Sequence, residues 1–108
     1  MVVVIGDARF SACRTYRWTL SRTWDDGPTL QVVGLNPSTA DEVHNDPTVT
    51  QCIRYAQRWG YGRLLMTNAY GLRSTDPRGL REVADPVGPR NDHWIRRCAT
   101  EADRVLIA

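Results

Sequence analysis

Two apolar runs separated by a helical pattern constrain the fold of this chain more than any other feature. Residues 30–35 are apolar at all but one position, and residues 63–67 form a second, mainly apolar run. Runs of this length without polar alternation are typical of strands covered on both faces. Between them, residues 47–59 carry apolar side chains at helical spacing, after the capping sequence Asp46-Pro47. The order strand, helix, strand predicts a crossover unit that joins two parallel strands.

An alternating segment precedes this unit. In residues 16–21 the side chains alternate, which predicts a half-buried strand with Trp18 and Leu20 on one face and Arg17 on the other. The turn sequence Asp26-Gly27-Pro28 follows, so we expect an N-terminal hairpin that leads into the strand at 30–35.

The second half of the chain completes the expected fold. Its patterns predict a short helix at 80–83, a helix at 94–102 and a third buried strand at 105–107. Together these elements predict an α/β fold with three α/β/α layers and a mainly parallel central sheet. An open edge of such a sheet could pair with a second copy or with a protein partner.

Length limits the organisation of the chain. With 108 residues and 42% hydrophobic composition, we expect a single ordered domain over residues 1–108. The sequence stops within the expected last strand, which favours a version of a longer fold that lacks its last strand and loop. The opening run at 1–5 is too short for a signal peptide or a membrane span, so we expect a cytoplasmic protein without membrane contact.

The charged and sulfur-containing residues narrow the function classes only partly. All 14 basic residues are arginine, against 12 acidic residues. Either a GC-rich genome or a phosphate-binding surface accounts for the arginines, and both explanations stay open.

Cys13, Cys52 and Cys98 lie far apart, which argues against a disulfide framework or a zinc site and favours small core residues. No motif for a metal or a cofactor is present, so we expect neither.

Polar segments follow the two central strands, where ligands bind in open α/β sheets. Asn36 directly follows the first strand, and Asn68 follows the second. Each asparagine could present its amide to a ligand or a water, although Asn36 could equally form a local turn before Pro37. Ser38 and Thr39 could hold a phosphate or cap a turn.

The charged residues of the same segment have structural alternatives. His44 could contact a ligand, but an exposed loop histidine is the more common case. Asp41, Glu42 and Asp46 form an acidic group in which one carboxylate could orient a water or a metal. Asp46, which precedes Pro47, fits a helix cap better.

Several motifs carry a resemblance to a known family. They are Gly34-Leu35-Asn36-Pro37-Ser38-Thr39-Ala40-Asp41, Asp46-Pro47-Thr48, Arg58-Trp59-Gly60-Tyr61-Gly62 and Thr67-Asn68. On these the chain is identified as a member of the family called domain of unknown function 1643, found in bacteria and phages.

The order of the strands and their Asn-containing ends is also similar to the uracil-DNA glycosylase superfamily. That resemblance implies that Asn36 positions a hydrolytic water and that Asn68 reads a base flipped out of DNA. The superfamily's later His-Pro motif has no counterpart before Ala108. The aromatic residue that stacks on the base is also missing, with His44 and Val49 as the nearest candidates.

The resemblance implies a nucleic-acid base-processing protein, with base N-glycosylase (hydrolase) activity as one outcome. Asn36 and Asp41 are then the candidate catalytic residues. The candidate substrate-binding residues are Gly34, Leu35, Pro37, Ser38, Thr39, His44, Asn68 and Arg73, with Arg73 and Arg78 meeting phosphates of DNA or a nucleotide. The alternatives are a non-catalytic module of phage or bacterial origin that binds DNA, a nucleotide or a protein, and a marginally folded genomic remnant.

Overall fold

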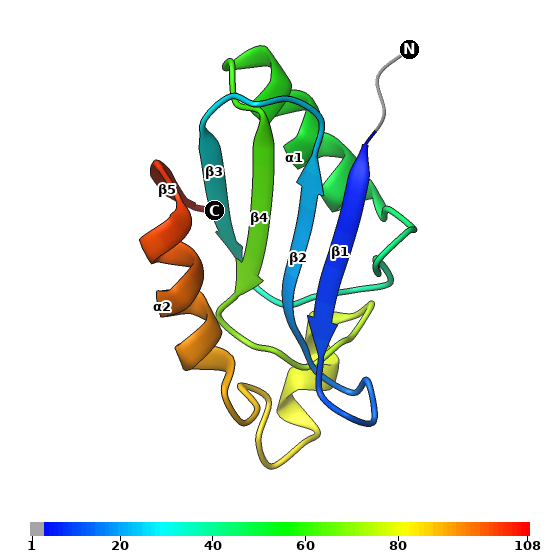
Figure 1. Ribbon diagram of the computed structural model, residues 1–108. Coiled ribbons are helices and arrows are strands. Elements are labelled where there is room, and N and C mark those ends of the chain that lie inside the picture. Colours follow the sequence, from blue (N-terminus) through cyan, green and yellow to red (C-terminus); the bar gives the residue numbers. More distant parts are fainter. Residues whose placement is uncertain (1–3) are drawn as a thin grey trace.

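The computed structural model describes residues 4–108, which form one mixed sheet flanked by helices (Figure 1). The strands are β1 (Ile5–Phe10), β2 (Arg17–Thr23), β3 (Thr29–Gly34), β4 (Arg63–Asn68) and β5 (Arg104–Ile107). The helices are α1 (Pro47–Arg58), α2 (Asn91–Glu101) and the short 3-10 helix η1 (Pro77–Arg81). Of the opening run at 1–5, residues 1–3 lie outside the described part of the chain.

The sheet is mixed rather than mainly parallel. Its strand order is β1-β2-β4-β3-β5, with β1–β2 and β2–β4 antiparallel and β4–β3 and β3–β5 parallel. The expected crossover is confirmed, because β3 and β4 pair in parallel and α1 joins them. The expectation of a mainly parallel sheet is not confirmed, because half of the neighbouring strand pairs are antiparallel.

The expected hairpin between residues 16–21 and 30–35 is wrong. β4 lies between β2 and β3, so the turn at 26–28 joins strands that do not pair. β4 is buried from Leu64 to Asn68 on both faces, and a central position suits such a strand better than an edge. The N-terminal hairpin is instead formed by β1 and β2, and the sequence reasoning did not anticipate β1.

The two helices cover opposite faces of the sheet (Figure 1). On one face, Val49 and Ala56 of α1 pack with Leu20, Leu64 and Met66 of the sheet. On the other face, Gln31 of β3 donates to Thr67 Oγ1 at 3.0 Å and to the carbonyl of Ile95 in α2 at 3.2 Å. These contacts give the expected three layers, with the apolar core on the α1 side.

Three local expectations need correction. β5 pairs with β3 at the predicted position, but its side chains are exposed, so it is an edge strand and not a buried one. The expected helix at 80–83 is the 3-10 helix η1 at 77–81, because Asp76 and Pro77 start it earlier. The three cysteines are free; Cys98 is buried and Cys52 half-buried, but Cys13 is exposed and not part of the core.

No helix in the described part of the chain is both long enough and apolar enough to cross a membrane.

Candidate functional site

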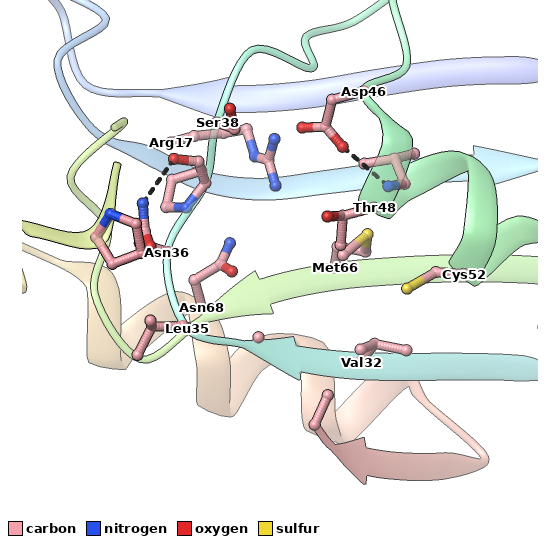
Figure 2. A pocket seen from close by; sticks show the side chains of 15 residues that line it. Arg17, Val32, Leu35, Asn36, Ser38, Asp46, Thr48, Cys52, Met66 and Asn68 are labelled. Atoms are coloured by element: carbon pink, nitrogen blue, oxygen red, sulfur yellow. Dashed lines mark hydrogen bonds between the residues drawn. The ribbon is translucent and has the colours of Figure 1, made fainter. Parts of the chain in front are cut away.

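A cavity of about 290 Å³ opens at the carboxyl ends of β3 and β4, on the face that α1 covers (Figure 2). Parallel pairing brings the last residues of the two strands, Gly34 and Asn68, into register at this edge. Because β2 is antiparallel to β4, its first residue, Arg17, also lies at this edge. The lining residues are Arg17, Val32, Gly34, Leu35, Asn36, Pro37, Ser38, Asp46, Thr48, Val49, Cys52, Met66, Asn68, Pro77 and Ala108.

Asn68 presents a buried amide to the cavity. Its relative exposure is 3%, and its Nδ2 group has no hydrogen-bond partner among the described residues. The backbone around it is fixed, since Asn91 Nδ2 donates to the Asn68 carbonyl at 2.8 Å. A Cβ atom on Gly34 would approach Asn68 Oδ1 to 2.8 Å, so a glycine opposite Asn68 leaves room for this side chain.

Asn36 is held by its amide nitrogen. Nδ2 donates to the carbonyl of Pro37 at 3.1 Å and to the carbonyl of Ser74 at 2.9 Å. The Ser74 backbone N–H in turn donates to the Pro37 carbonyl at 2.9 Å. These bonds tie the loop after β3 to the loop before η1 and leave Asn36 Oδ1 as an acceptor.

Arg17 is the residue at this site that the sequence reasoning missed. It was expected on the face opposite Leu20, but the register of β1 and β2 shifts so that Phe10 pairs with Arg17 and Trp18 is left without a partner. Such a bulge reverses the alternation of side chains. Trp18 consequently stacks on Trp94 of α2, with 6.3 Å between ring centroids, and Arg17 turns into the cavity on the α1 side.

The Arg17 side chain is enclosed but incompletely paired. Its relative exposure is 2%, Nη1 donates to the Ala40 carbonyl at 3.2 Å, and Nε has no partner among residues 4–108. Burial lowers the pKa of Arg17 to about 10, partly offset by the negative charge of Asp46, and Arg73 and Arg22 lower it further. The guanidinium therefore stays charged at neutral pH.

Asp46 is the carboxylate that lines the cavity, and it caps α1 as expected. Oδ1 accepts from the Val49 N–H at 2.9 Å and Oδ2 from the Ala40 N–H at 3.3 Å. Both oxygens are thus engaged in backbone contacts. The structure confirms the capping role, and the alternative role of Asp46, orienting a water or a metal, stays a prediction.

Asp41 and His44 lie outside the cavity. Asp41 Oδ1 accepts from the backbone N–H groups of His44 and Val43, at 2.7 and 3.0 Å, and these bonds hold its pKa well below the usual value. The His44 ring contacts Asp41 at 3.1 Å while its side chain is 77% exposed. Both residues therefore shape the loop before α1.

Arg73 and Thr39 also lie beside the cavity rather than in it. Arg73 Nε donates to the Ser38 carbonyl at 3.3 Å and Nη2 to the Thr39 carbonyl at 3.4 Å. Arg73 borders a shallow depression of about 330 Å³, which shares Ser38 with the cavity. Arg78 binds Asp76 through its guanidinium at 2.7 Å.

The structure thus brings six of the ten candidate residues together around one cavity. They are Gly34, Leu35, Asn36, Pro37, Ser38 and Asn68. The three acidic residues Asp41, Glu42 and Asp46 do not form one cluster, because Glu42 pairs with Arg14 at 2.8 Å on the surface. Within residues 4–108, no cluster of three or more His, Cys, Asp or Glu side chains is arranged to hold a metal ion.

Fold and site together define a small α/β protein with a ligand-sized cavity at the ends of two parallel strands. The family model described as "Protein of unknown function (DUF1643)" matches residues 17–108. The chain belongs to this family. Comparison with curated proteins and with solved structures finds no match, so the resemblance to the uracil-DNA glycosylase superfamily has no support from these comparisons.

Proposed function

We propose that this chain is a nucleic-acid base-processing protein that holds a nucleobase in the cavity between Asn36 and Asn68. The observation that carries the proposal is the buried Asn68 amide with its unpartnered nitrogen. A buried polar group without a partner is costly, and a ligand that supplies the partner removes the cost. An amide offers a donor and an acceptor side by side, which matches the edge of a base.

The size of the cavity supports a small ligand. At about 290 Å³ it lies just below the roughly 300–1,000 Å³ common for small-molecule sites. Its walls mix apolar side chains such as Val32 and Met66 with a few polar groups, as in small-molecule sites generally. A uracil-DNA-glycosylase-like fold, with the base extruded from DNA, is the finer form of this proposal.

In the hydrolytic form of the proposal, Asn36 Oδ1 orients a water toward the sugar carbon of the bound nucleoside. The water oxygen bonds to that carbon, and the carbon–nitrogen bond breaks with its electron pair going to the departing base. The base also takes up the proton that the water loses. An amide cannot take the proton from the water, so Asn36 acts by orientation alone and turnover is slow.

The first test measures binding. Calorimetric titration with uracil and uridine is expected to detect binding by the wild type and by the control Gln57→Ala on the exposed side of α1. Asn68→Ala is expected to lose about tenfold or more in affinity, since one side of its amide contact disappears. Unchanged binding by Asn68→Ala refutes the assignment of the base site.

A non-catalytic binding module is the second candidate, and the engagement of the carboxylates favours it. Asp46 caps α1, and Asp41 lies outside the cavity and fastens its own loop, so both carboxylates expected near the site have structural hydrogen bonds. Uracil-containing DNA incubated with the wild type and with Asn36→Ala distinguishes the two. An abasic product that Asn36→Ala reduces favours hydrolysis, and DNA binding without any abasic product favours the binding module.

A further inference from the structure

Two arginines of β2 are buried on the same side of the sheet, and their surroundings differ. Arg22 makes four hydrogen bonds: Nε donates to Asn45 Oδ1 at 2.8 Å, and its other nitrogens donate to the carbonyls of Ser21, Asp41 and His44. These bonds make Arg22 a structural residue that fastens the loop before α1. Arg17, five residues earlier, has one hydrogen bond to a protein carbonyl.

Arg17 also makes no direct ion pair among the described residues, although the charge of Asp46 lies near enough to raise its pKa. The ion pairs among residues 4–108 are Arg14–Glu42, His44–Asp41 and Arg78–Asp76, and Arg17 is in none of them. The nearby carboxylate of Asp46 is engaged by two backbone N–H groups. An enclosed guanidinium without a directly paired anion is costly to a fold, because one hydrogen bond and a nearby charge offset only part of its loss of hydration.

Arg17 and Asn68 line the same cavity. Figure 2 shows the Arg17 guanidinium and the Asn68 amide pointing toward one another across the cavity. The first turn of α1, which holds Thr48 and Val49 and contains no acidic residue, forms part of the wall. The N-terminus of α1 is already capped by the Asp46 carboxylate, so Arg17 is the group of this wall that favours negative charge.

We propose that Arg17 is an oxyanion-binding residue and that the ligand of this cavity is a nucleotide, with its phosphate on Arg17 and its base on Asn68. The base end of this assignment rests on the function proposed above, whereas the oxyanion end rests on Arg17 alone. A guanidinium binds a phosphate through two parallel N–H groups, which lysine cannot reproduce.

The experiment uses three probes with the full chain: inorganic phosphate, uridine and uridine 5′-monophosphate. The monophosphate is expected to bind at least about tenfold more tightly than uridine, because a buried charge gains a partner. Phosphate alone is expected to raise the melting temperature of the wild type, since a ligand of the folded state stabilises it. Acetate in place of phosphate distinguishes a carboxylate site from a phosphate site; stabilisation by acetate and not by phosphate overturns the nucleotide assignment.

Three variants test whether the phosphate effect and the preference for the monophosphate depend on Arg17. Arg17→Met keeps the length of the side chain and is expected to fold with equal or higher stability while it binds uridine and the monophosphate equally. Arg17→Lys keeps the charge and is expected to retain part of the preference for the monophosphate over uridine. The control Arg54→Met removes an exposed arginine of α1 outside the cavity and is expected to behave as the wild type.

The outcomes separate the two proposals. If uridine binds and the monophosphate binds no more tightly, the oxyanion site is refuted while the base site stands. If phosphate stabilises the wild type but not Arg17→Met, and uridine does not bind, the base site is refuted while the oxyanion site stands. If the phosphate effect persists in Arg17→Met, Arg17 is not its receptor.

Discussion

Gly34 offers a direct test of the close packing at the end of β3. A methyl group on Gly34 would come within 2.8 Å of Asn68 Oδ1, closer than real Cβ atoms approach a heavy atom. Gly34 lies in a strand and is not among the glycines with positive φ, so alanine fits its backbone. The Gly34→Ala substitution therefore tests one contact and not the conformation of the chain.

The expected effect reverses sign with the residue opposite. In the wild type, the methyl group must displace an enclosed Asn68, and such overpacking costs about 1–3 kcal/mol. In Asn68→Ala the space is free, and replacing glycine by alanine at a compatible position stabilises by about 0.4–1 kcal/mol through the unfolded chain. We therefore expect Gly34→Ala to lower the unfolding free energy in the wild type and to raise it in Asn68→Ala.

Urea unfolding of the wild type, the two single variants and the double variant measures this coupling. The single variant Asn68→Ala serves as its own reference, so any cost of removing the amide cancels. Equal effects of Gly34→Ala in both backgrounds, whether stabilising or destabilising, would refute the contact. The same variant in the wild type is expected to weaken uridine binding, because Asn68 is moved from its position.

Three other measurements test separate contacts. Asp46→Ala is expected to cost about 0.5–2 kcal/mol of unfolding free energy by removing the cap of α1. Asp92 is an exposed residue in the first turn of α2, and Asp92→Ala is expected to change the unfolding free energy less. Equal effects of the two substitutions in urea unfolding would contradict the capping role. The Cys13 thiol is exposed, and hydrogen bonds with its neighbours, chiefly Thr15, lower its pKa to about 7. Burial raises the pKa of Cys52 and Cys98. Iodoacetamide followed by mass spectrometry is therefore expected to modify Cys13 first, and faster labelling of either other cysteine would be the opposite result. The hydrogen bonds from Arg14 lower the pKa of Glu42 from 4.5 to about 2, so its stabilisation is fully present above pH 4.5 and is lost as the pH falls through about 2. Glu42→Gln is expected to flatten the stability profile in that window, and an unchanged acid profile would speak against the pair.

The expected strand, helix and strand at 30–67 were confirmed because each of these segments carries its own signal. A buried strand is apolar throughout, and the Asp46-Pro47 cap marks the start of α1 wherever the helix packs. The neighbours of each strand carry no such local signal. Nothing between residues 16 and 35 indicates that β4 inserts between β2 and β3, because that pairing depends on residues about 40 positions away.

The candidate site follows the same division. Asn36 and Asn68 could be placed at one edge from sequence, because the ends of parallel neighbouring strands meet there. Arg17 could not, because alternation assigned it to the other face and a bulge reverses alternation without changing composition. The opposite error occurred at Asp41 and His44, which adjoin the motif in sequence but turn toward each other instead of the cavity.

The sequence by itself determined the family, the crossover unit and the position of the two asparagines at strand ends. These follow from local patterns of burial and from motifs, both of which are readable along one dimension. The tertiary structure alone decided the mixed pairing of the sheet and the burial of Arg17 beside Asn68. The physical reason is that both depend on how distant segments pair, and a one-residue shift in that pairing moves a charged side chain from one face of a sheet to the other.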